Sequence, residues 1–445
     1  MIERRELSPV ELTRACLDRI DAGNADLRAF ITVMREQALA DAARAEEEIG
    51  KTHYRGALHG IPVSVKDLVS IAGTPTTSGS NVPARHPRHD APVVANLRRA
   101  GAVIVGKTNL HEFAFGTTSD ETAFGAVRNP HDRSRSAGGS SAGAAVALVE
   151  GMCFGSVGTD TGGSIRIPAA ACGVTGLKPT LAEISTEGVV PLSTTCDHVG
   201  PLALSVADAA LMYFAMLDGD ARVERLSAPA DGQLWLGVPE AYFLDKLDDG
   251  TRASFTHARS RLLAAGHAIS SVSVAHAQRT ADVYLHICLP ESSWYHAPLL
   301  KEHAERYSPG VRLRLEMGRY ILAEDYVRAL HGRTALQRAV DRALEGLDAL
   351  VLPALAIGAP PLGATSVVID GASQPVRAMM LRLTQLFNIT GHPAIAIPCG
   401  TGADGLPRSV QLVGHRGGTE RLLAVAAALE RQITGGPGSV GGGAG

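Results

Sequence analysis

Short apolar runs alternate with amphipathic stretches of helical length along most of the chain. Residues 7–50 open with the helix-start sequence SPVE and are rich in Ala and Glu, so we predict helix there. A helix predicted at 91–101 is followed by the apolar run 102–107, which has the length of a buried strand. The same alternation continues through 142–160, and it predicts an α/β protein.

The second half of the chain keeps this alternation. A strand predicted at 234–239 lies between helices predicted at 205–217 and 251–265. The stretch 296–347 is long, charged and helical, and we predict that it forms a cap over a core. Strand character returns in DALVLPA, AIAIPCG and SVQLVG, and TERLLAVAAALERQI predicts a closing helix. The Gly-rich tail 435–445 cannot bury a core and is predicted to be flexible.

Composition excludes several classes of partner. The 445 residues are 45% apolar and carry a net charge of −3, so we expect neither nucleic acid nor an anionic membrane as a partner. No apolar run reaches the roughly 18 residues of a membrane span. The charged N-terminus lacks the apolar core of a secretion signal, so we expect a cytoplasmic location. The six cysteines form no CxxC pair, which favours buried, reduced thiols.

Two motif-like stretches do not support a cofactor or a metal. Residues 101–108 match the phosphate-loop pattern G-x4-GK[ST], but their middle residues, AVIV, are the predicted strand itself rather than a loop. The sequence HEFAF begins like a zinc-protease helix, but a phenylalanine stands where the second histidine is needed. The sixteen histidines show no ligand spacing. We therefore favour structural or substrate-lining roles for His59, His111 and His198 near the candidate site.

Two glycine-rich loops, 138–143 and 161–164, place Ser140 and Ser164 only 24 positions apart. In TGGS the glycines permit a sharp turn whose amides point one way, and this turn would stabilise an oxyanion beside the Ser164 hydroxyl. A tight structural turn is the alternative for this loop, and a helix N-cap after a flexible loop is the alternative for GGSSAG. Asp160 and Arg166 flank the second loop and either pair to pin it or form a surface ion pair.

A lysine is the economical base for such a serine, because the two loops contain no histidine. Of 42 basic residues only six are lysine and 36 are arginine, which cannot give up its proton. Lys66 lies in GIPVSVKDLVSI, an apolar strand that would lower its pKa by desolvation. Asp67 would oppose that shift unless it points to the opposite face of the strand. Lys107, at a strand end, and Lys178, before a proline, are weaker candidates.

These loops lie within longer sequences that resemble a known family. The run GGSSAGAAVALVEGMCFGSVGTDTGGSIRIPAAACGVTGLKPT is similar, nearly residue for residue, to the signature of the amidase signature enzymes. Further counterparts are GALHGIPVSVKDLVSIAGTPTTSGS and FNITGHPAIAIPCGTGADGLPRSVQLVG. The resemblance covers about 5–215 and 340–430 and is weak over 220–340. It implies one domain over 1–434, with a central mixed β-sheet covered by helices on both faces, a core at about 50–215 and 340–430, and a variable helical cap.

The resemblance also implies roles for the site residues. Ser164 would be the nucleophile, Ser140 a bridging serine preceded by a cis peptide bond, and Lys66 the base. The implied oxyanion hole consists of backbone amides, those of Thr161, Gly162, Gly163 and Ser164. The implied supporting side chains are Ser141, Thr159, Asp160 and Arg166. The family mechanism needs no metal and no organic cofactor.

The implied activity is hydrolysis of small or medium carboxamides through an acyl-enzyme. Carbamate (urethane) or ester hydrolysis by the same groups is the nearest alternative. A glutaminase-type component of a transfer-RNA amidotransferase complex and a catalytically silent scaffold are further alternatives. The expected partner is a small-molecule amide or carbamate, with no nucleic acid and no membrane, and we expect a monomer or homodimer.

Selectivity depends on residues that the sequence interprets only weakly. After GLKPT the chain has Leu181-Ala182-Glu183, where the family often has Tyr-Gly-Arg near the substrate entrance, so we expect unusual selectivity. Four apolar side chains near the candidate site fit an apolar acyl pocket and a buried core equally well; they are Phe113, Phe115, Phe124 and Leu192.

Overall fold

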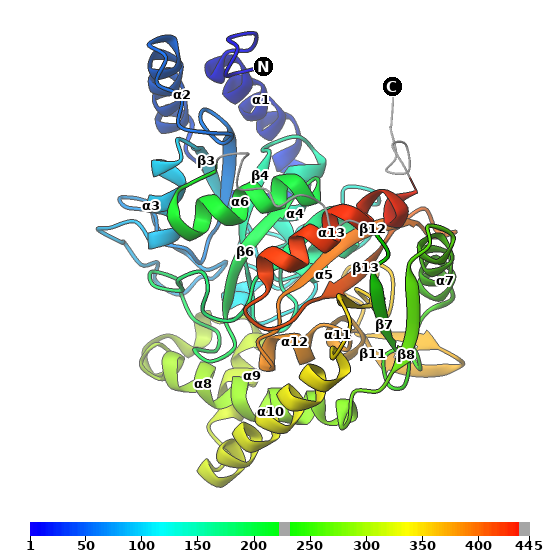
Figure 1. The fold of residues 1–445 in the computed structure, drawn as a ribbon. Coiled ribbons are helices and arrows are strands. Elements are labelled where there is room, and N and C mark those ends of the chain that lie inside the picture. The colour runs from blue at the N-terminus through cyan, green and yellow to red at the C-terminus, as the bar shows by residue number, and fades with distance from the viewer. Residues whose placement is uncertain (222–231, 436–445) are drawn as a thin grey trace.

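A mixed β-sheet of eleven strands organises the chain in the computed structural model, which describes residues 1–221 and 232–435 (Figure 1). In spatial order the strands are β1 (Phe30–Val33), β3 (Val103–Thr108), β2 (Pro62–Lys66), β4 (Gly155–Asp160), β6 (His198–Ala203), β5 (Thr175–Lys178), β12 (Ala394–Thr401), β13 (Pro407–Val413), β9 (Ala349–Pro353), β7 (Trp235–Pro239) and β8 (Ala268–Val272). A separate hairpin pairs β10 (Ser366–Ile369) with β11 (Ala372–Pro375).

Helices cover both faces of this sheet. One face packs against α3 (Pro92–Arg99), α6 (Val206–Asp218), α7 (Asp249–Ala264) and α13 (Thr419–Thr434). The other face packs against α1 (Pro9–Leu27), α2 (Arg35–Gly50), α4 (Ala142–Val149) and α5 (Arg166–Cys172). The predicted α/β class with a central mixed sheet is therefore confirmed.

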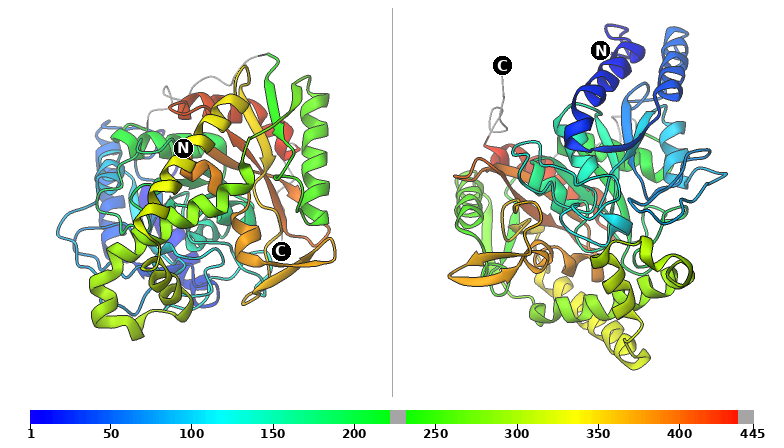
Figure 2. Two further views of the ribbon diagram at one scale, coloured as in Figure 1. Left: turned by 90° about the horizontal axis from the view of Figure 1, so that it is seen from below. Right: turned by 180° about the vertical axis from the view of Figure 1, so that it is seen from behind.

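A third hydrophobic cluster beside the sheet is built by α8 (Thr280–His303), α9 (Pro309–Gly318), α10 (Ala323–Ala343), α12 (Gln385–Ile389) and the short 3-10 turns η1 (Glu112–Ala114) and η3 (Ala277–Arg279). Helix α11 (Val376–Leu381) packs in the cluster of α4 and α5, and the turn η4 (Ala304–Arg306) has no buried residue. Figures 1 and 2 show that α8, α9 and α10 gather at the end of the molecule opposite to α1 and α2. The stretch 220–340 also supplies β7 and β8 to the sheet edge, and its description as a cap stays a prediction.

Central strands are buried on both sides, which explains their continuous apolar sequences. In β12, Ile395 and Ile397 belong to the cluster on the side of α7 and α13, whereas Ala396 belongs to the cluster on the side of α5. Successive side chains of a strand point to opposite faces, so a strand covered on both faces needs apolar residues at every position. The apolar runs in the sequence are therefore a direct consequence of the two helical layers.

Two predicted helical stretches are subdivided in the structure. The stretch 7–50 contains β1, whose sequence FITV pairs antiparallel with β3 and completes that edge of the sheet. Aromatic and β-branched residues favour this extended conformation over the helix on either side. The stretch 296–347 belongs to three helices, and α8 starts before it at Thr280. Pro309 begins α9, where its missing N–H and fixed φ are tolerated.

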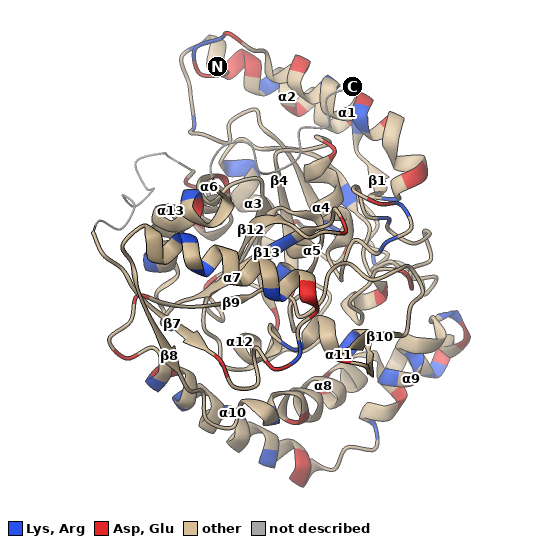
Figure 3. Ribbon diagram, turned by 90° about the vertical axis from the view of Figure 1, so that its right-hand side faces the viewer, with Lys and Arg blue, Asp and Glu red and all other residues tan. Residues whose placement is uncertain are grey.

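Charge is carried mainly by the outer helices, where both signs are interspersed (Figure 3). Within the described part of the chain, no helix is long and apolar enough to cross a membrane. All six cysteines fall in this part and are buried, free thiols, as the sequence indicated. The predicted Gly-rich tail lies, apart from Gly435, outside the described residues.

Parallel pairing of β2 with both β3 and β4 brings three strand ends to one edge of the sheet. Ser64 is paired with Ser156 and Val65 with Val157, so Lys66 at the end of β2 lies beside the last residues of β4, Thr159 and Asp160. The carboxyl ends of parallel strands open toward the same side. This edge is where the two serine loops lie.

Lys107 makes a buried ion pair at the same edge and is thereby removed from the candidate bases. Its Nζ lies 2.6 Å from Asp67 Oδ1, and both side chains are fully buried. Nζ also donates to Pro75 O at 2.9 Å and to Thr76 Oγ1 at 2.7 Å. The phosphate-loop-like sequence is therefore strand β3, as predicted, and Asp67 faces Lys107 rather than Lys66.

Lys107→Ala should lower the free energy of unfolding by about 3–5 kcal/mol, because it leaves the Asp67 carboxylate buried without its counter-charge. The measurement is the shift of the urea unfolding midpoint followed by circular dichroism. Lys51→Ala removes an exposed pair with Glu47 and should change stability by about 1 kcal/mol or less. Equal midpoints for the two variants would contradict this account of the buried pair.

Candidate active site

Three hydroxyl groups surround the amine of Lys66. Its Nζ lies 2.7 Å from Ser140 Oγ, 2.8 Å from Ser141 Oγ and 2.8 Å from Thr159 Oγ1, and all four residues are buried. Among the described residues, no carboxylate lies within ion-pair distance of this amine. The site therefore brings together the lysine and the first serine loop that the sequence singled out.

Burial lowers the pKa of Lys66 from its usual value to about 7. The carboxylates of Asp160 and Asp197 oppose this shift, because they favour the ammonium form, but they do not contact the amine and their effect is smaller. An apolar setting that disfavours charge is what the sequence around Lys66 indicated. Near neutral pH a substantial fraction of Lys66 is consequently the free amine, which can accept a proton.

The first serine loop crosses the sheet edge just before α4. The peptide bond between Gly139 and Ser140 is cis, as the resemblance implied. The Ser140 carbonyl accepts hydrogen bonds from His111 N at 3.2 Å and Ser119 Oγ at 3.4 Å. A Cβ on Gly139 would lie 2.8 Å from the Thr117 carbonyl carbon, so the close approach of segment 117–119 requires glycine here.

The second serine loop, 161–164, connects β4 to α5. Ser164 is buried, with 5% of its surface exposed. Ser141 N donates to Ser164 O at 3.2 Å, which joins the two loops through their backbones. Gly163 has φ +137°, a conformation that side chains rarely adopt. Among the described residues the Ser164 hydroxyl makes no hydrogen bond, so the described link between the two loops is the backbone bond from Ser141 N to Ser164 O.

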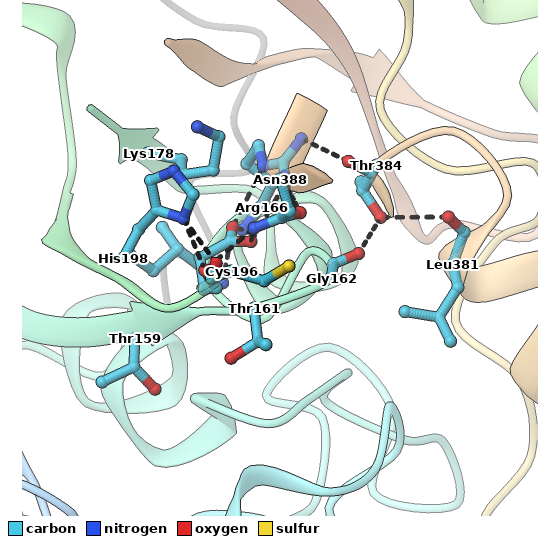
Figure 4. A network of polar contacts seen from close by, with 12 residues as sticks. Thr159, Thr161, Gly162, Arg166, Lys178, Cys196, His198, Leu381, Thr384 and Asn388 are labelled. Carbon is cyan, nitrogen blue, oxygen red and sulfur yellow. Dashed lines mark hydrogen bonds and ion pairs between the residues drawn. The ribbon is translucent and has the colours of Figure 1, made fainter. Parts of the chain in front are cut away.

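Asp160 and Arg166, at the two ends of this loop, form a buried pair. Figure 4 shows Arg166 close to Asn388 and Thr384. Arg166 donates Nε to Asp160 Oδ2 and Nη2 to Asp160 Oδ1, both at 3.0 Å, in the two-pronged geometry that arginine favours. Burial alone would raise the pKa of Asp160, but the guanidinium holds it well below its usual range. Asp160 Oδ2 also accepts from Ile165 N at 3.2 Å. Of the two alternatives that the sequence left open, the pair that pins the loop is the one present.

Four further polar residues complete this support, and the sequence analysis did not name them as site residues. Thr384 Oγ1 donates to Gly162 O at 2.5 Å, and Asn388 Nδ2 donates to Asp160 O at 2.9 Å. Gln411 Oε1 accepts from Arg166 Nη1 at 2.5 Å. These three residues lie more than 200 positions from the loop. Asn388 and Gln411 fall within a sequence quoted for the resemblance, FNITGHPAIAIPCGTGADGLPRSVQLVG, whereas no quoted sequence includes Thr384.

Asp197 is the fourth missed residue and lies on the other side of the loop. It accepts from Thr161 Oγ1 at 2.5 Å and from Leu192 N at 2.9 Å. Burial raises the pKa of Asp197 to about 6, although these hydrogen bonds oppose the shift. Asp197 therefore holds Thr161 in place and adds a negative charge to the site above about pH 6.

The other candidate residues have structural surroundings. His198 is buried, its Nδ1 lies 2.8 Å from Cys196 O, and burial holds its pKa well below the usual value (Figure 4). Lys178 is buried and donates to Pro179 O at 3.0 Å. Among the apolar candidates, Phe113, Phe115 and Leu192 belong to the hydrophobic cluster with α8, whereas 36% of Phe124 is exposed. In the described residues, no group of three or more His, Cys, Asp or Glu side chains could hold a metal ion.

Comparison with known proteins identifies the family. The family model described as Amidase matches residues 11–423. An amidase of Pseudomonas putida is 36% identical over 447 residues, which cover 97% of this chain and 94% of the relative. A glutamyl-tRNA(Gln) amidotransferase subunit of Chloroflexus aggregans is 34% identical, over 96% of this chain and 93% of the relative. A crystal structure of an amidase has a TM-score of 0.92 at 37% identity, covering 97% of this chain and 98% of that chain.

The chain therefore belongs to the amidase family of hydrolases, and the resemblance seen in the sequence is confirmed. The match includes both serine loops and the strand that carries Lys66. It also includes the stretch 220–340, where the resemblance noted from the sequence was weak.

Asp197→Asn should lower the pKa of Lys66 below about 7, because it removes one of the two negative charges that favour the ammonium form. With only six lysines in the chain, the titration can be followed by NMR of lysine-labelled protein, with Lys66→Arg to assign the resonance. Glu305→Gln removes a carboxylate that is 71% exposed and should leave this pKa unchanged. A rise in the pKa of Lys66 in Asp197→Asn would refute the argument.

Proposed function

We propose that the protein hydrolyses the C–N bond of small or medium carboxamides through an acyl-enzyme formed on Ser164. The observation that carries this proposal is the buried Lys66 amine, 2.7 Å from Ser140 Oγ and without a carboxylate partner among the described residues. An amine of this kind is a base near neutral pH, and the serine loop that would use it is joined to the Ser140 loop through the bond from Ser141 N to Ser164 O.

The hydrogen-bond pattern around neutral Lys66 favours proton transfer from Ser140. A neutral amine has two N–H donors and one lone pair. Ser141 Oγ donates its own hydrogen to Thr159 O at 3.2 Å, so it is an acceptor toward Lys66. If Thr159 Oγ1 accepts the second N–H, the lone pair is left for the Ser140 hydroxyl. Ser141 and Thr159 thereby orient the base.

The catalytic cycle then follows from these groups. Lys66 takes a proton from Ser140 while Ser140 takes one from Ser164, whose oxygen attacks the substrate carbonyl. The proton returns through Ser140 to the departing amine and leaves an acyl-enzyme, which water cleaves by the same relay. The amides of Thr161, Gly162, Gly163 and Ser164 would hold the oxyanion, and loss of one such donor typically costs about 10²–10³ in turnover.

Two other functions use the same chemistry and are distinguished by substrate. Carbamates and esters present a carbonyl to the same nucleophile, so a panel of amide, carbamate and ester substrates ranks these activities. Similarity to a glutamyl-tRNA(Gln) amidotransferase subunit supports a glutaminase role within a complex, which would appear as activity only with added partner proteins. We favour a monomer or homodimer that acts in the cytoplasm on a small molecule without partner proteins. The net charge of −3 gives no reason to expect transfer RNA as a partner.

Ser164→Ala and Lys66→Ala should each reduce amide turnover by about 10⁴-fold or more, because members of such a relay act as a unit. Ser140→Ala should be severe too, and gentler on activated esters, whose leaving group needs no proton. The measurement is hydrolysis of p-nitroanilide and p-nitrophenyl ester substrates, with Ser134→Ala in an exposed turn as the control. Wild-type amide turnover in Ser164→Ala would show that the nucleophile is misassigned.

The pH profile of kcat/KM should rise about tenfold per pH unit up to about pH 7 and then level off. The sign follows from Lys66, whose burial lowers the pKa to about 7, so that the amine is protonated below this pH and free above it. The control is the reaction of an ester with a small nucleophile in solution, without the enzyme. Its rate over the same pH range gives the pH dependence that does not come from Lys66. A profile that falls between pH 6 and 8 would exclude neutral Lys66 as the base.

A further inference from the structure

A cavity of about 430 Å³ opens beside the catalytic loops, between segment 116–121, segment 363–365 and the start of α11. Its lining includes Thr117 and Thr118, whose backbones pack against Gly139 in the first serine loop. It also includes Arg377 from α11 and Arg314 from α9. Nothing in the proposed acyl transfer uses either arginine.

Helix α11 connects this cavity to the second serine loop, 161–164, whose amides form the proposed oxyanion hole; it is called the oxyanion loop below. Leu381, at its other end, is a neighbour of Gly162, because a Cβ on Gly162 would lie 3.2 Å from Leu381 Cδ2. The Leu381 carbonyl also accepts from Thr384 Oγ1, which holds Gly162. Arg377 lies four residues before Leu381, about 6 Å along the helix axis. Arg377 is therefore one helical turn from Leu381, the residue of α11 that neighbours Gly162.

Arg377 has more hydrogen-bond capacity than the protein uses. Its only described hydrogen bond is from Nη1 to Phe115 O at 3.3 Å, and a guanidinium has five N–H donors. Within the described residues no carboxylate lies within ion-pair distance of it. Desolvation lowers the pKa of Arg377 to about 10, and the nearby charge of Arg314 acts in the same direction. A desolvated cation of this kind is strongly stabilised by an anion that enters the cavity.

The other charges of the cavity already have partners. Glu121 accepts from Arg314 Nη2 at 3.0 Å and contacts His111 Nε2 at 3.2 Å. Asp120 accepts from Thr118 Oγ1 at 2.5 Å and from Glu121 N at 3.1 Å. Arg377 is thus the cation of this cavity that has no carboxylate within ion-pair distance among the described residues, whereas Arg314 is paired with Glu121.

We propose that Arg377 binds a carboxylate carried by the substrate, so that the enzyme acts on amides with an anionic group. This inference rests on the proposed amide hydrolysis and adds the substrate class. The planar guanidinium matches a carboxylate in a two-pronged geometry, with the Thr117 and Thr118 side chains lining the same cavity.

The test compares matched substrates in wild type, Arg377→Gln and Arg377→Lys. One arm varies the acyl part, with succinamate and glutaramate against their methyl esters. The other varies the departing amine, with N-acylglycines against the matching N-acylglycine amides. In one of the two arms, wild type should have a higher kcat/KM for the carboxylates than for their neutral partners. That arm shows whether the substrate's carboxylate lies on the acyl part or on the departing amine. Arg377→Gln should lower kcat/KM for those carboxylates by about 10- to 100-fold and change the neutral partners by less than about threefold. Arg377→Lys should restore part of the preference.

The controls separate this inference from folding and from the proposed function. Arg312→Gln removes an α9 cation that is paired with Glu316 and does not line the cavity, and it should leave the preference unchanged. Labelling of Ser164 by a fluorophosphonate checks that each variant retains its catalytic centre. The role of Arg377 would be overturned if wild type cleaved neutral amides as well as amides that carry a carboxylate. It would also be overturned if Arg377→Gln lowered kcat/KM equally for both kinds of substrate. Neither result would affect the proposed amide hydrolysis. If wild type cleaved no amide of either kind, the proposed function itself would fail.

Discussion

The buried amine of Lys66 contacts three hydroxyl oxygens at 2.7–2.8 Å. Among the described residues no carboxylate contacts this amine, and the rest of the site is arranged around these three hydrogen bonds. A charged amine would lose its hydration here, whereas a neutral amine needs only two acceptors and one donor. The parallel strands β2 and β4 supply Lys66 and Thr159 at one sheet edge, and the loop before α4 supplies the two serines. Lys66 can accept a proton because no carboxylate of the described residues contacts its amine and stabilises the charged form.

Two other buried cations near the site, Lys107 and Arg166, are paired with carboxylates. Lys107 contacts the Asp67 carboxylate, and Arg166 is held by both oxygens of Asp160, so each has a carboxylate partner in a low-dielectric interior. These pairs fix the geometry of the site: the pair of Arg166 with Asp160 holds together the two ends of the second serine loop, 161–164. Lys66 therefore differs from Lys107 and Arg166 in lacking a carboxylate partner, not in the depth of burial. Lys178 is buried as well, and its amine donates to Pro179 O rather than to the serine loops.

The proposed selectivity depends on elements outside the two serine loops. Helix α11 contacts the oxyanion loop at Leu381 and presents Arg377 to the cavity one turn away, while α9 contributes Arg314. These elements surround a centre whose own groups recognise only a carbonyl and a leaving amine. In the proposed mechanism, variation in these elements would change the substrate without changing the acyl-transfer chemistry.

By itself, the sequence determined the α/β class, the glycine-rich turns and the apolar setting of Lys66, because these depend on local pattern and on residues close in the chain. It also allowed the Asp160–Arg166 pair to be anticipated, since its members are six positions apart. Only the tertiary structure decided that Asp67 turns to Lys107, that Thr384, Asn388 and Gln411 brace a loop more than 200 positions away, and that Arg377 faces a cavity without a described counter-ion. Those contacts depend on the order of the strands in the sheet and on how the helices pack. Neither can be predicted from the distance along the chain between the residues in contact.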